Sequence, residues 1–196
     1  MDSELGFFET VKLQTGYFKE DFKVYKKRNF SFGNLFNKAV NILTCHGLHI
    51  MFFYRLGKMI YSIEIPIVSH ILKIIFQVFR FLISTFYGID IIMTSKIGPG
   101  FYIGHFSGII IDGEFGQNCS IGQCVTVGTK GAGKSDGTPL FGDNVYVGAG
   151  AKIIGSLKIG SNVRIGANAV VITDIPDNSI AVGVPAKVKP IPQEDE

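Results

Sequence analysis

The sequence predicts a mainly β protein, a parallel β-helix built on a six-residue repeat and preceded by an α-helical region. Three observations point to this fold. Glycine is abundant, and 18 of the 24 glycines lie after residue 88. Phenylalanine shows the opposite distribution, with 13 of its 17 residues in the first 88 positions. An apolar residue also recurs at every sixth position from residue 91 onward. Two architectures therefore meet near Gly88.

The six-residue period holds at all thirteen positions where it is due, and a glycine follows nine of them. Each hexad is expected to form a short strand and a turn, with the apolar residue inside the shaft and the glycine at the corner. Three hexads make one coil, so residues 18 apart stack. The apolar positions are Ile91, Ile97, Ile103, Ile109, Phe115, Ile121, Val127, Phe141, Val147, Ile153, Ile159, Ile165 and Val171.

The repeat divides the chain into residues 1–88 as a helical region for oligomerisation or docking, 89–190 as the β-helix, and 191–196 as an acidic tail. One glycine-rich, charged segment, residues 129–139, interrupts the repeat. Excursions from a rigid solenoid often carry functional groups. Before Gly88, apolar spacing predicts helices over 34–45 and 48–62 and a third that begins at Pro66.

The third predicted helix has only a thin polar stripe, so we expect it to be buried in a bundle or oligomer contact, with a membrane surface as the alternative. Its charged residues Lys73 and Arg80, together with His70, argue against a membrane-spanning helix.

Net charge is +3, with +5 in residues 1–88 and −2 in the remainder. This balance does not favour nucleic-acid binding. The longest basic run, Lys26-Lys27-Arg28, is either a solvated face or a docking patch for an anionic membrane or polymer. Three cysteines without CxxC spacing and an acidic first segment predict a reduced, cytoplasmic protein, with the inner face of the membrane as a further location.

Of the four histidines, only His105 lies within the repeat. A three-histidine zinc site on the β-helix is therefore excluded, and no metal is expected. His105 follows the corner residue Gly104, so its side chain is expected to point outward. An outward histidine is either a surface residue or a catalytic base.

An ordered set of motifs decides between these alternatives. The set is Gly88-Ile89-Asp90-Ile91, Lys96-Ile97-Gly98, His105 fifteen residues after Asp90, the segment 129–139, residues 148–155, and Gly183-Val184-Pro185-Ala186-Lys187. Together these motifs resemble the serine acetyltransferase family of hexapeptide acyltransferases over residues 88–190. The resemblance implies a left-handed β-helix, a homotrimer or dimer of trimers, and acetyl-CoA bound between subunits. It assigns His105 as the general base and Asp90 as the carboxylate that orients it.

Ala149 and Ala167 are 18 residues apart and each follows a glycine, so they are expected to stack and leave room for a flat ligand. They match the family's pantetheine groove, with Thr129 at its entrance. Candidates for the CoA phosphates, each of which is equally an ordinary solvated charge, are Lys134, Lys152, Arg164 and Lys187. A rival mechanism with an acyl-cysteine at Cys124 is disfavoured, because no histidine lies near it in the sequence.

The expected acceptor region contains Gly104, Asp136 and Thr138, where the sequence departs from the family pattern. Serine acetyltransferases carry an acidic residue before the catalytic histidine and end the loop with Asp-Arg-His-Pro, whereas this chain has Gly104 and Asp136-Gly137-Thr138-Pro139. A free amino acid needs charged partners that a sugar hydroxyl does not.

The sequence therefore resembles the capsule and exopolysaccharide branch of the family. We expect an acetyl-CoA-dependent O-acetyltransferase that acts on a glycan acceptor, a cell-surface polysaccharide or its precursor. Serine O-acetyltransferase and a non-catalytic β-helix scaffold are the alternatives.

Overall fold

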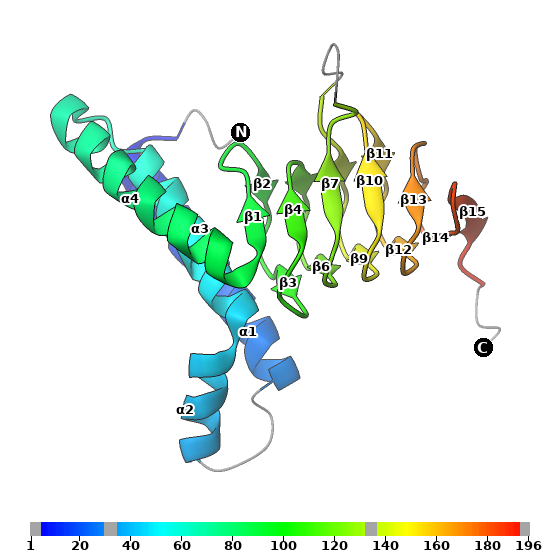
Figure 1. Cartoon of the computed structure of the whole chain (residues 1–196), viewed down its shortest axis with the longest axis horizontal. Helices are drawn as coiled ribbons and strands as arrows, with labels where there is room; N and C mark the ends of the chain where they lie inside the picture. Colours follow the sequence, from blue (N-terminus) through cyan, green and yellow to red (C-terminus); the bar gives the residue numbers. More distant parts are fainter. Residues whose placement is uncertain (1–4, 30–34, 132–136, 193–196) are drawn as a thin grey trace.

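The computed structural model describes residues 5–29, 35–131 and 137–192. Four helices come first along the chain, α1 (Phe7–Asn29), α2 (Leu35–Thr44), α3 (His46–Tyr61) and α4 (Pro66–Tyr87), and a solenoid of short strands follows. The helices gather at the β1 end of the solenoid, and the C-terminal strands lie at the opposite end (Figure 1). The structure is thus a parallel β-helix with an N-terminal helical region, which confirms the predicted fold class.

The solenoid has three walls, and each wall is a sheet in which strands of successive coils pair in parallel. The five-stranded wall has the order β1-β4-β7-β10-β13, the four-stranded wall β11-β8-β5-β2, and the six-stranded wall β15-β14-β12-β9-β6-β3. Only the pair β14–β15 is antiparallel among the pairings of the described strands. The bounds are β1 (Ile89–Ile91), β2 (Lys96–Ile97), β3 (Tyr102–Ile103), β4 (Ile109–Ile111), β5 (Glu114–Phe115), β6 (Ser120–Ile121), β7 (Thr126–Gly128), β8 (Leu140–Phe141), β9 (Tyr146–Val147), β10 (Lys152–Ile154), β11 (Lys158–Ile159), β12 (Arg164–Ile165), β13 (Val170–Val171), β14 (Ser179–Val182) and β15 (Lys187–Pro190).

All thirteen predicted shaft residues are buried, each with at most 6% of its surface exposed. Their side chains fill the shaft, and Phe115 stacks face to face on Phe141 with ring centroids 4.1 Å apart. Phe101 meets Phe115 edge-on at 5.2 Å. Since apolar burial contributes roughly 25 cal/mol per Å², this continuous column is the main stabilising feature of the solenoid.

Helix α1 was not among the predicted helices, because its buried face is polar. Thr10, Gln14 and Asp21 are buried on it together with Tyr25. The face therefore lacks the apolar stripe by which an amphipathic helix is identified in a sequence. The Asp21 carboxylate accepts a hydrogen bond from the backbone N–H of Phe101 (2.9 Å), and the Tyr25 hydroxyl accepts one from Ile103 N–H (2.8 Å). Helix α1 is therefore docked on β3 through polar contacts.

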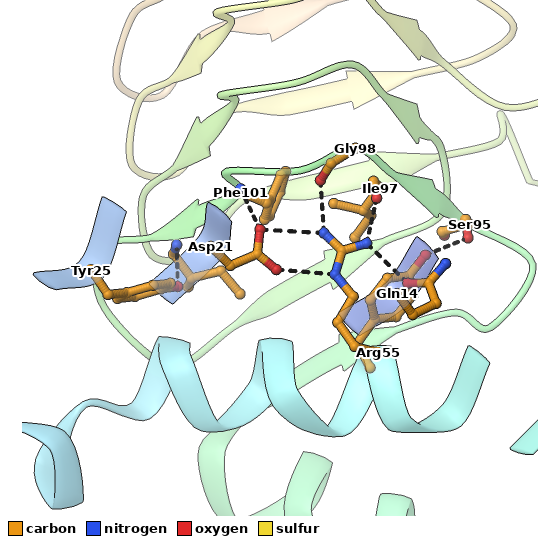
Figure 2. A network of polar contacts seen from close by, with 10 residues as sticks. Gln14, Asp21, Tyr25, Arg55, Ser95, Ile97, Gly98 and Phe101 are labelled. Carbon is orange, nitrogen blue, oxygen red and sulfur yellow. Dashed lines mark hydrogen bonds and ion pairs between the residues drawn. The ribbon is translucent and has the colours of Figure 1, made fainter. Parts of the chain in front are cut away.

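Arg55 of α3 joins the helices to the first coil of the solenoid (Figure 2). Its guanidinium donates to Asp21 through Nε (3.0 Å) and Nη2 (3.3 Å), and to Gln14 through Nη1 (3.3 Å). It also donates to the backbone carbonyls of Ile97 (2.6 Å) and Gly98 (2.7 Å). The side chain is 2% exposed, so one buried cation satisfies the carbonyls that the first coil would otherwise leave open.

Helix α4 ends at Gly88, whose φ of 63° places it in the left-handed region that favours glycine. Only Ser69 and Phe76 of this helix are buried, so the helix is not covered by an intramolecular bundle. Among the described residues α4 is the one helix long and apolar enough to cross a membrane, by length and composition. Its exposed apolar side chains are Ile67, Val68, Ile71, Ile74, Ile75, Val78, Phe79, Phe81, Leu82 and Phe86.

Candidate active site

The corner that carries His105 is two residues longer than the equivalent corners of the later coils. In the later coils this corner joins shaft residues six positions apart, Ile121 to Val127 and Val147 to Ile153. In the first coil the equivalent residues are Ile103, which pairs with Ile121, and Ile111, which pairs with Val127, and they are eight positions apart. The prediction that Ile109 stacks between Ile91 and Val127 is therefore wrong, because Ile111 is the residue that pairs with both. Ile109 remains buried in the shaft, two residues before this position.

His105 and Phe106 are the two extra residues of this corner. Ser107 accepts a backbone hydrogen bond from Cys124 N–H (3.0 Å), in the same way that Gln123 accepts one from Gly150 in the next coil (2.8 Å). Ser107 thus takes the stacking position, and the two residues before it form a bulge. Both bulge side chains are exposed, so the corner lifts an imidazole off the solenoid wall.

The helical region holds this bulge in place. The Phe106 ring packs on His46 at the start of α3, with centroids 4.4 Å apart, and His46 meets Tyr87 of α4 edge-on at 5.2 Å. Ser107 N–H donates to the carbonyl of Tyr87 (3.0 Å). The first turn of α3 and the last turn of α4 therefore fix the corner from which His105 projects.

A groove of about 440 Å³ lies beside His105. Gln123 and Ala149, at the same corner of the next two coils, line it. The coils pack closely here, because a Cβ at Gly122 would lie 2.8 Å from the Ala149 nitrogen. Ala167 follows in the next coil and is exposed. Gln123, Ala149 and Ala167 thus stack at one corner of successive coils, as the spacing of the two alanines predicts, and His105 projects from the same corner of the preceding coil. We call this row of corner residues the track.

No hydrogen bond or ion pair joins Asp90 to His105 in the structure. Its carboxylate accepts a hydrogen bond from Arg80 Nη1 of α4 (2.5 Å), and Arg80 Nε donates to Gln77 (2.8 Å). Asp90 and Arg80 line a small hollow under α4, whereas His105 lines the groove beside Ala149.

The predicted CoA ligands are spread over two walls. The Lys152 ammonium donates to the Cys124 carbonyl (2.6 Å) and the Thr126 hydroxyl (3.1 Å), so it is already engaged. Thr129 directly follows β7 and is half-buried, Arg164 is exposed on β12, and Lys187 is exposed on β15. Lys134 and Asp136 lie outside the described residues.

Gly104 and Thr138 do not come together at one pocket. Gly104 lines the groove beside His105, whereas Thr138 directly precedes the four-stranded wall. A Cβ at Gly104 would have no neighbour closer than 3.6 Å. The position therefore has room for a side chain, and the absence of an acidic group there is a chemical property of this sequence rather than a steric requirement.

The Cys119 thiol is poorly suited to act as a nucleophile. Burial raises the pKa of the Cys119 thiol to about 11, so this thiol stays protonated at neutral pH. Cys119 Sγ donates to the Gly142 carbonyl (3.3 Å), and Cys124 is exposed. Within the described ranges no group of three His, Cys, Asp or Glu residues could hold a metal ion.

Seven residues that line the groove were not among the predicted site residues, namely Arg28, Tyr102, Ser120, Ile121, Gly122, Gln123 and Tyr146. Tyr102 and Tyr146 line it from β3 and β9, and Arg28 reaches it from the end of α1. The tyrosines each precede a shaft residue by one, which is the outward strand position. Arg28 lies seven residues after Asp21, on the helix face that docks against β3.

The segment over residues 139–173 matches the family described as bacterial transferase hexapeptide (six repeats). A serine acetyltransferase of Helicobacter pylori (strain J99) is 39% identical over 153 residues, covering 77% of this chain and 85% of the relative. A serine acetyltransferase of Bacillus pumilus is 36% identical over 149 residues, covering 75% of this chain and 65% of the relative. This chain therefore spans about two thirds of the Bacillus relative.

Solved structures agree with the sequence relatives. The crystal structure of the Neisseria gonorrhoeae serine acetyltransferase in complex with serine superposes with a TM-score of 0.72 at 28% identity, over 90% of this chain and 69% of that one. The match extends over most of both parts of the chain, helices and solenoid together. By its hexapeptide repeat, its fold and the extent of these matches, the chain belongs to the serine acetyltransferase family.

Proposed function

We propose that the protein is an acetyl-CoA-dependent O-acetyltransferase in which His105 is the general base. The observation that carries this proposal is the corner bulge, which projects an exposed imidazole at the end of the track formed by Gln123, Ala149 and Ala167. A thioester laid along this track would present its carbonyl at the imidazole. Family membership supports the same activity.

The chemistry follows from the pKa values of the groups. A hydroxyl has a pKa far above 7 and attacks a thioester only when a base takes its proton, and imidazole, with an ordinary pKa of about 6.5, is suited to this. His105 accepts the hydroxyl proton as the oxygen bonds to the carbonyl carbon. When the carbon–sulfur bond breaks, the CoA thiolate leaves and takes that proton from the imidazolium.

Two of the three track residues, Ala149 and Ala167, have small side chains, which leave room for the flat pantetheine arm of acetyl-CoA. Ala149 and Ala167 would contact the pantetheine arm, and Thr129 would lie at the entrance. The exposed cations Arg164 and Lys187 remain free to reach phosphates, whereas Lys152 would have to leave Cys124 and Thr126. Lys134 is proposed from its sequence position alone.

Asp90 is proposed to orient His105 during turnover. A carboxylate partner fixes the tautomer of a catalytic imidazole and stabilises its protonated form. In the structure Arg80 holds the Asp90 carboxylate, so this role requires the Arg80–Asp90 ion pair to open when substrates bind.

Two acceptor classes are supported by different observations. The names of the relatives support L-serine. The lining of the groove supports a sugar hydroxyl of a cell-surface polysaccharide or its precursor, because none of the described residues lining it is acidic. An amino acid carries an ammonium group, and binding it away from water without a carboxylate is unfavourable.

One assay separates these acceptors. The rate of CoA release from acetyl-CoA is measured with L-serine, with oligosaccharides, and without acceptor, for the wild type and His105→Ala. We expect His105-dependent release with a saccharide that exceeds the release with serine at least ten-fold. Faster turnover of serine would contradict the sugar acceptor, and no His105-dependent release with any acceptor would favour a non-catalytic scaffold.

We further propose a homotrimer in the cytoplasm, in which a neighbouring copy supplies the second wall of the acetyl-CoA track. The exposed side of Ala167 supports this assembly, because one chain alone leaves the track open. The exposed apolar face of α4 is the surface through which trimers would pair or contact the inner face of the membrane.

A further inference from the structure

The groove beside His105 continues along the outer face of the six-stranded wall. A second hollow of about 560 Å³ adjoins it, and the two share Arg28, Ser120 and Tyr146. Its far end is lined by Asn162 and Arg164. The outward residues of β3, β6, β9 and β12 follow one another along this face, namely Tyr102, Ser120, Tyr146 and Arg164. We call this depression the wall groove; the corner residues Gln123 and Ala149 lie at its edge and belong to the acetyl-CoA track.

The wall groove is cationic and aromatic. Among the described residues its lining contains two arginines and two tyrosines and no aspartate or glutamate. The Arg28 guanidinium lies over the Tyr102 ring, 4.3 Å from its centroid, and Tyr146 is 50% exposed. Such a surface is complementary to an anionic ligand that also has flat, weakly polar faces.

Arg28 is placed over the groove by the docking of α1. Asp21 and Tyr25 accept hydrogen bonds from the backbone N–H groups of Phe101 and Ile103, which flank Tyr102 on either side. Asp21, Tyr25 and Arg28 are spaced i, i+4 and i+7, so they share one helix face. The buried contacts of the first two therefore set the position of the third.

Hydrogen-bonding groups line the far part of the wall groove. The Asn144 amide donates to Asn162 (3.1 Å), and the Asn162 amide donates to Asn178 (3.0 Å). Each amide has two N–H donors and a carbonyl with two lone pairs, so the ladder uses only part of its capacity. The remaining groups at this edge can bind hydroxyls.

We propose that the wall groove binds an anionic oligosaccharide, with the acceptor sugar beside His105 and its acidic group on Arg28. This inference rests on the proposed acetyl transfer and names its acceptor class. The C–H face of a sugar ring packs on Tyr146, its hydroxyls bind the asparagine amides, and a carboxylate pairs with an arginine in two hydrogen bonds.

The length of the groove also fits an oligomer better than an amino acid. Parallel strands are about 4.8 Å apart, so the three steps from Tyr102 to Arg164 span about 14 Å. A single serine would occupy only the end next to His105. Two or three sugar rings would fill the whole row.

The test is direct binding in the absence of acetyl donor. Calorimetry compares a tetramer of galacturonic acid with maltotetraose, a neutral oligomer of equal length, and with CoA alone. We expect the acidic tetramer to bind at least ten-fold more tightly than the neutral one. Arg28→Gln and Tyr146→Ala should each weaken its binding at least ten-fold, whereas Tyr146→Phe and the matched control Lys26→Gln should change it less than two-fold.

Several results would overturn the proposal. Equal affinity for the two tetramers, or equal losses in Arg28→Gln and Lys26→Gln, would show that no specific site exists. Variants that weaken CoA binding instead would assign the wall groove to CoA, and variants that change the number of copies per particle would assign it to a subunit contact.

Failure of the two proposals can be told apart. Binding needs no turnover, so His105→Ala should still bind the tetramer. Tetramer binding without any His105-dependent transfer would refute the proposed activity and leave the binding site intact. Transfer to serine without tetramer binding would refute the oligosaccharide site and leave the acetyl-transfer activity intact.

Discussion

Replacing His105 with alanine is expected to lower the rate of acetyl transfer by 10²- to 10⁴-fold, the usual contribution of a positioned general base. His105 projects from the corner that carries Gln123, Ala149 and Ala167, and no other described histidine lines the groove. The loss should appear in the turnover number rather than in the KM for acetyl-CoA, because the imidazole is needed for proton transfer and not for holding the pantetheine arm. Steady-state CoA release at saturating acceptor measures it.

The matched control is His70→Ala, which removes an exposed histidine from α4. Both variants should melt at the temperature of the wild type, since neither side chain is buried. A His105→Ala variant that keeps more than a tenth of the wild-type turnover, or a His70→Ala variant that loses as much as His105→Ala, would contradict the assignment.

Replacing Arg55 with methionine is expected to destabilise the fold by about 3–5 kcal/mol, the usual cost of removing one partner of a buried ion pair. Burial already raises the pKa of the Asp21 carboxyl, against the opposing effect of Arg55. Without the guanidinium, Asp21 loses its cationic partner, and the carbonyls of Ile97 and Gly98 lose a donor. Urea unfolding followed by circular dichroism measures the change.

Lys23→Ala is the control for this prediction. Lys23 also forms an ion pair in α1, with Glu20, but both side chains are at least half exposed. Exposed pairs contribute little, so the unfolding midpoint should stay close to that of the wild type. If Arg55→Met unfolds at the same urea concentration as Lys23→Ala, the buried network does not anchor the helices to the solenoid.

The solenoid was predictable because its apolar shaft residues recur with a regular six-residue period in the sequence. An apolar residue every six positions with glycine behind it has no competing explanation in helix or strand periodicity. The one error in register arose at Ile109-Ile110-Ile111, where three isoleucines offer apolar side chains at both candidate positions. Hydrophobicity alone could not show which isoleucine stacks on Val127. In the structure the hydrogen bond from Cys124 N–H to the Ser107 carbonyl fixes the register so that Ile111 does.

The helical region was predictable only where its faces are apolar. Helices α2, α3 and α4 were located within one or two residues, whereas α1 was missed because Gln14 and Asp21 occupy its buried face. A buried polar face depends on partners far along the chain, such as Arg55 and Phe101. Local spacing in the sequence carries no information about them.

The candidate site was also predictable only in part. His105 and the track of Ala149 and Ala167 followed from position and resemblance, and the structure places them along one corner. The pairing of Asp90 with Arg80 was not foreseen, because it depends on how α4 crosses β1. The wall groove was also missed, since Arg28 and Tyr146 meet only after α1 has docked.

A structure of the protein crystallised with CoA tests the central claim most directly. We predict that the pantetheine arm lies along Gln123, Ala149 and Ala167 and that the CoA sulfur comes within reach of the His105 imidazole. CoA bound elsewhere, for example over Tyr146 and Asn162 with its sulfur remote from His105, would contradict the assignment of this corner as the site of acetyl transfer.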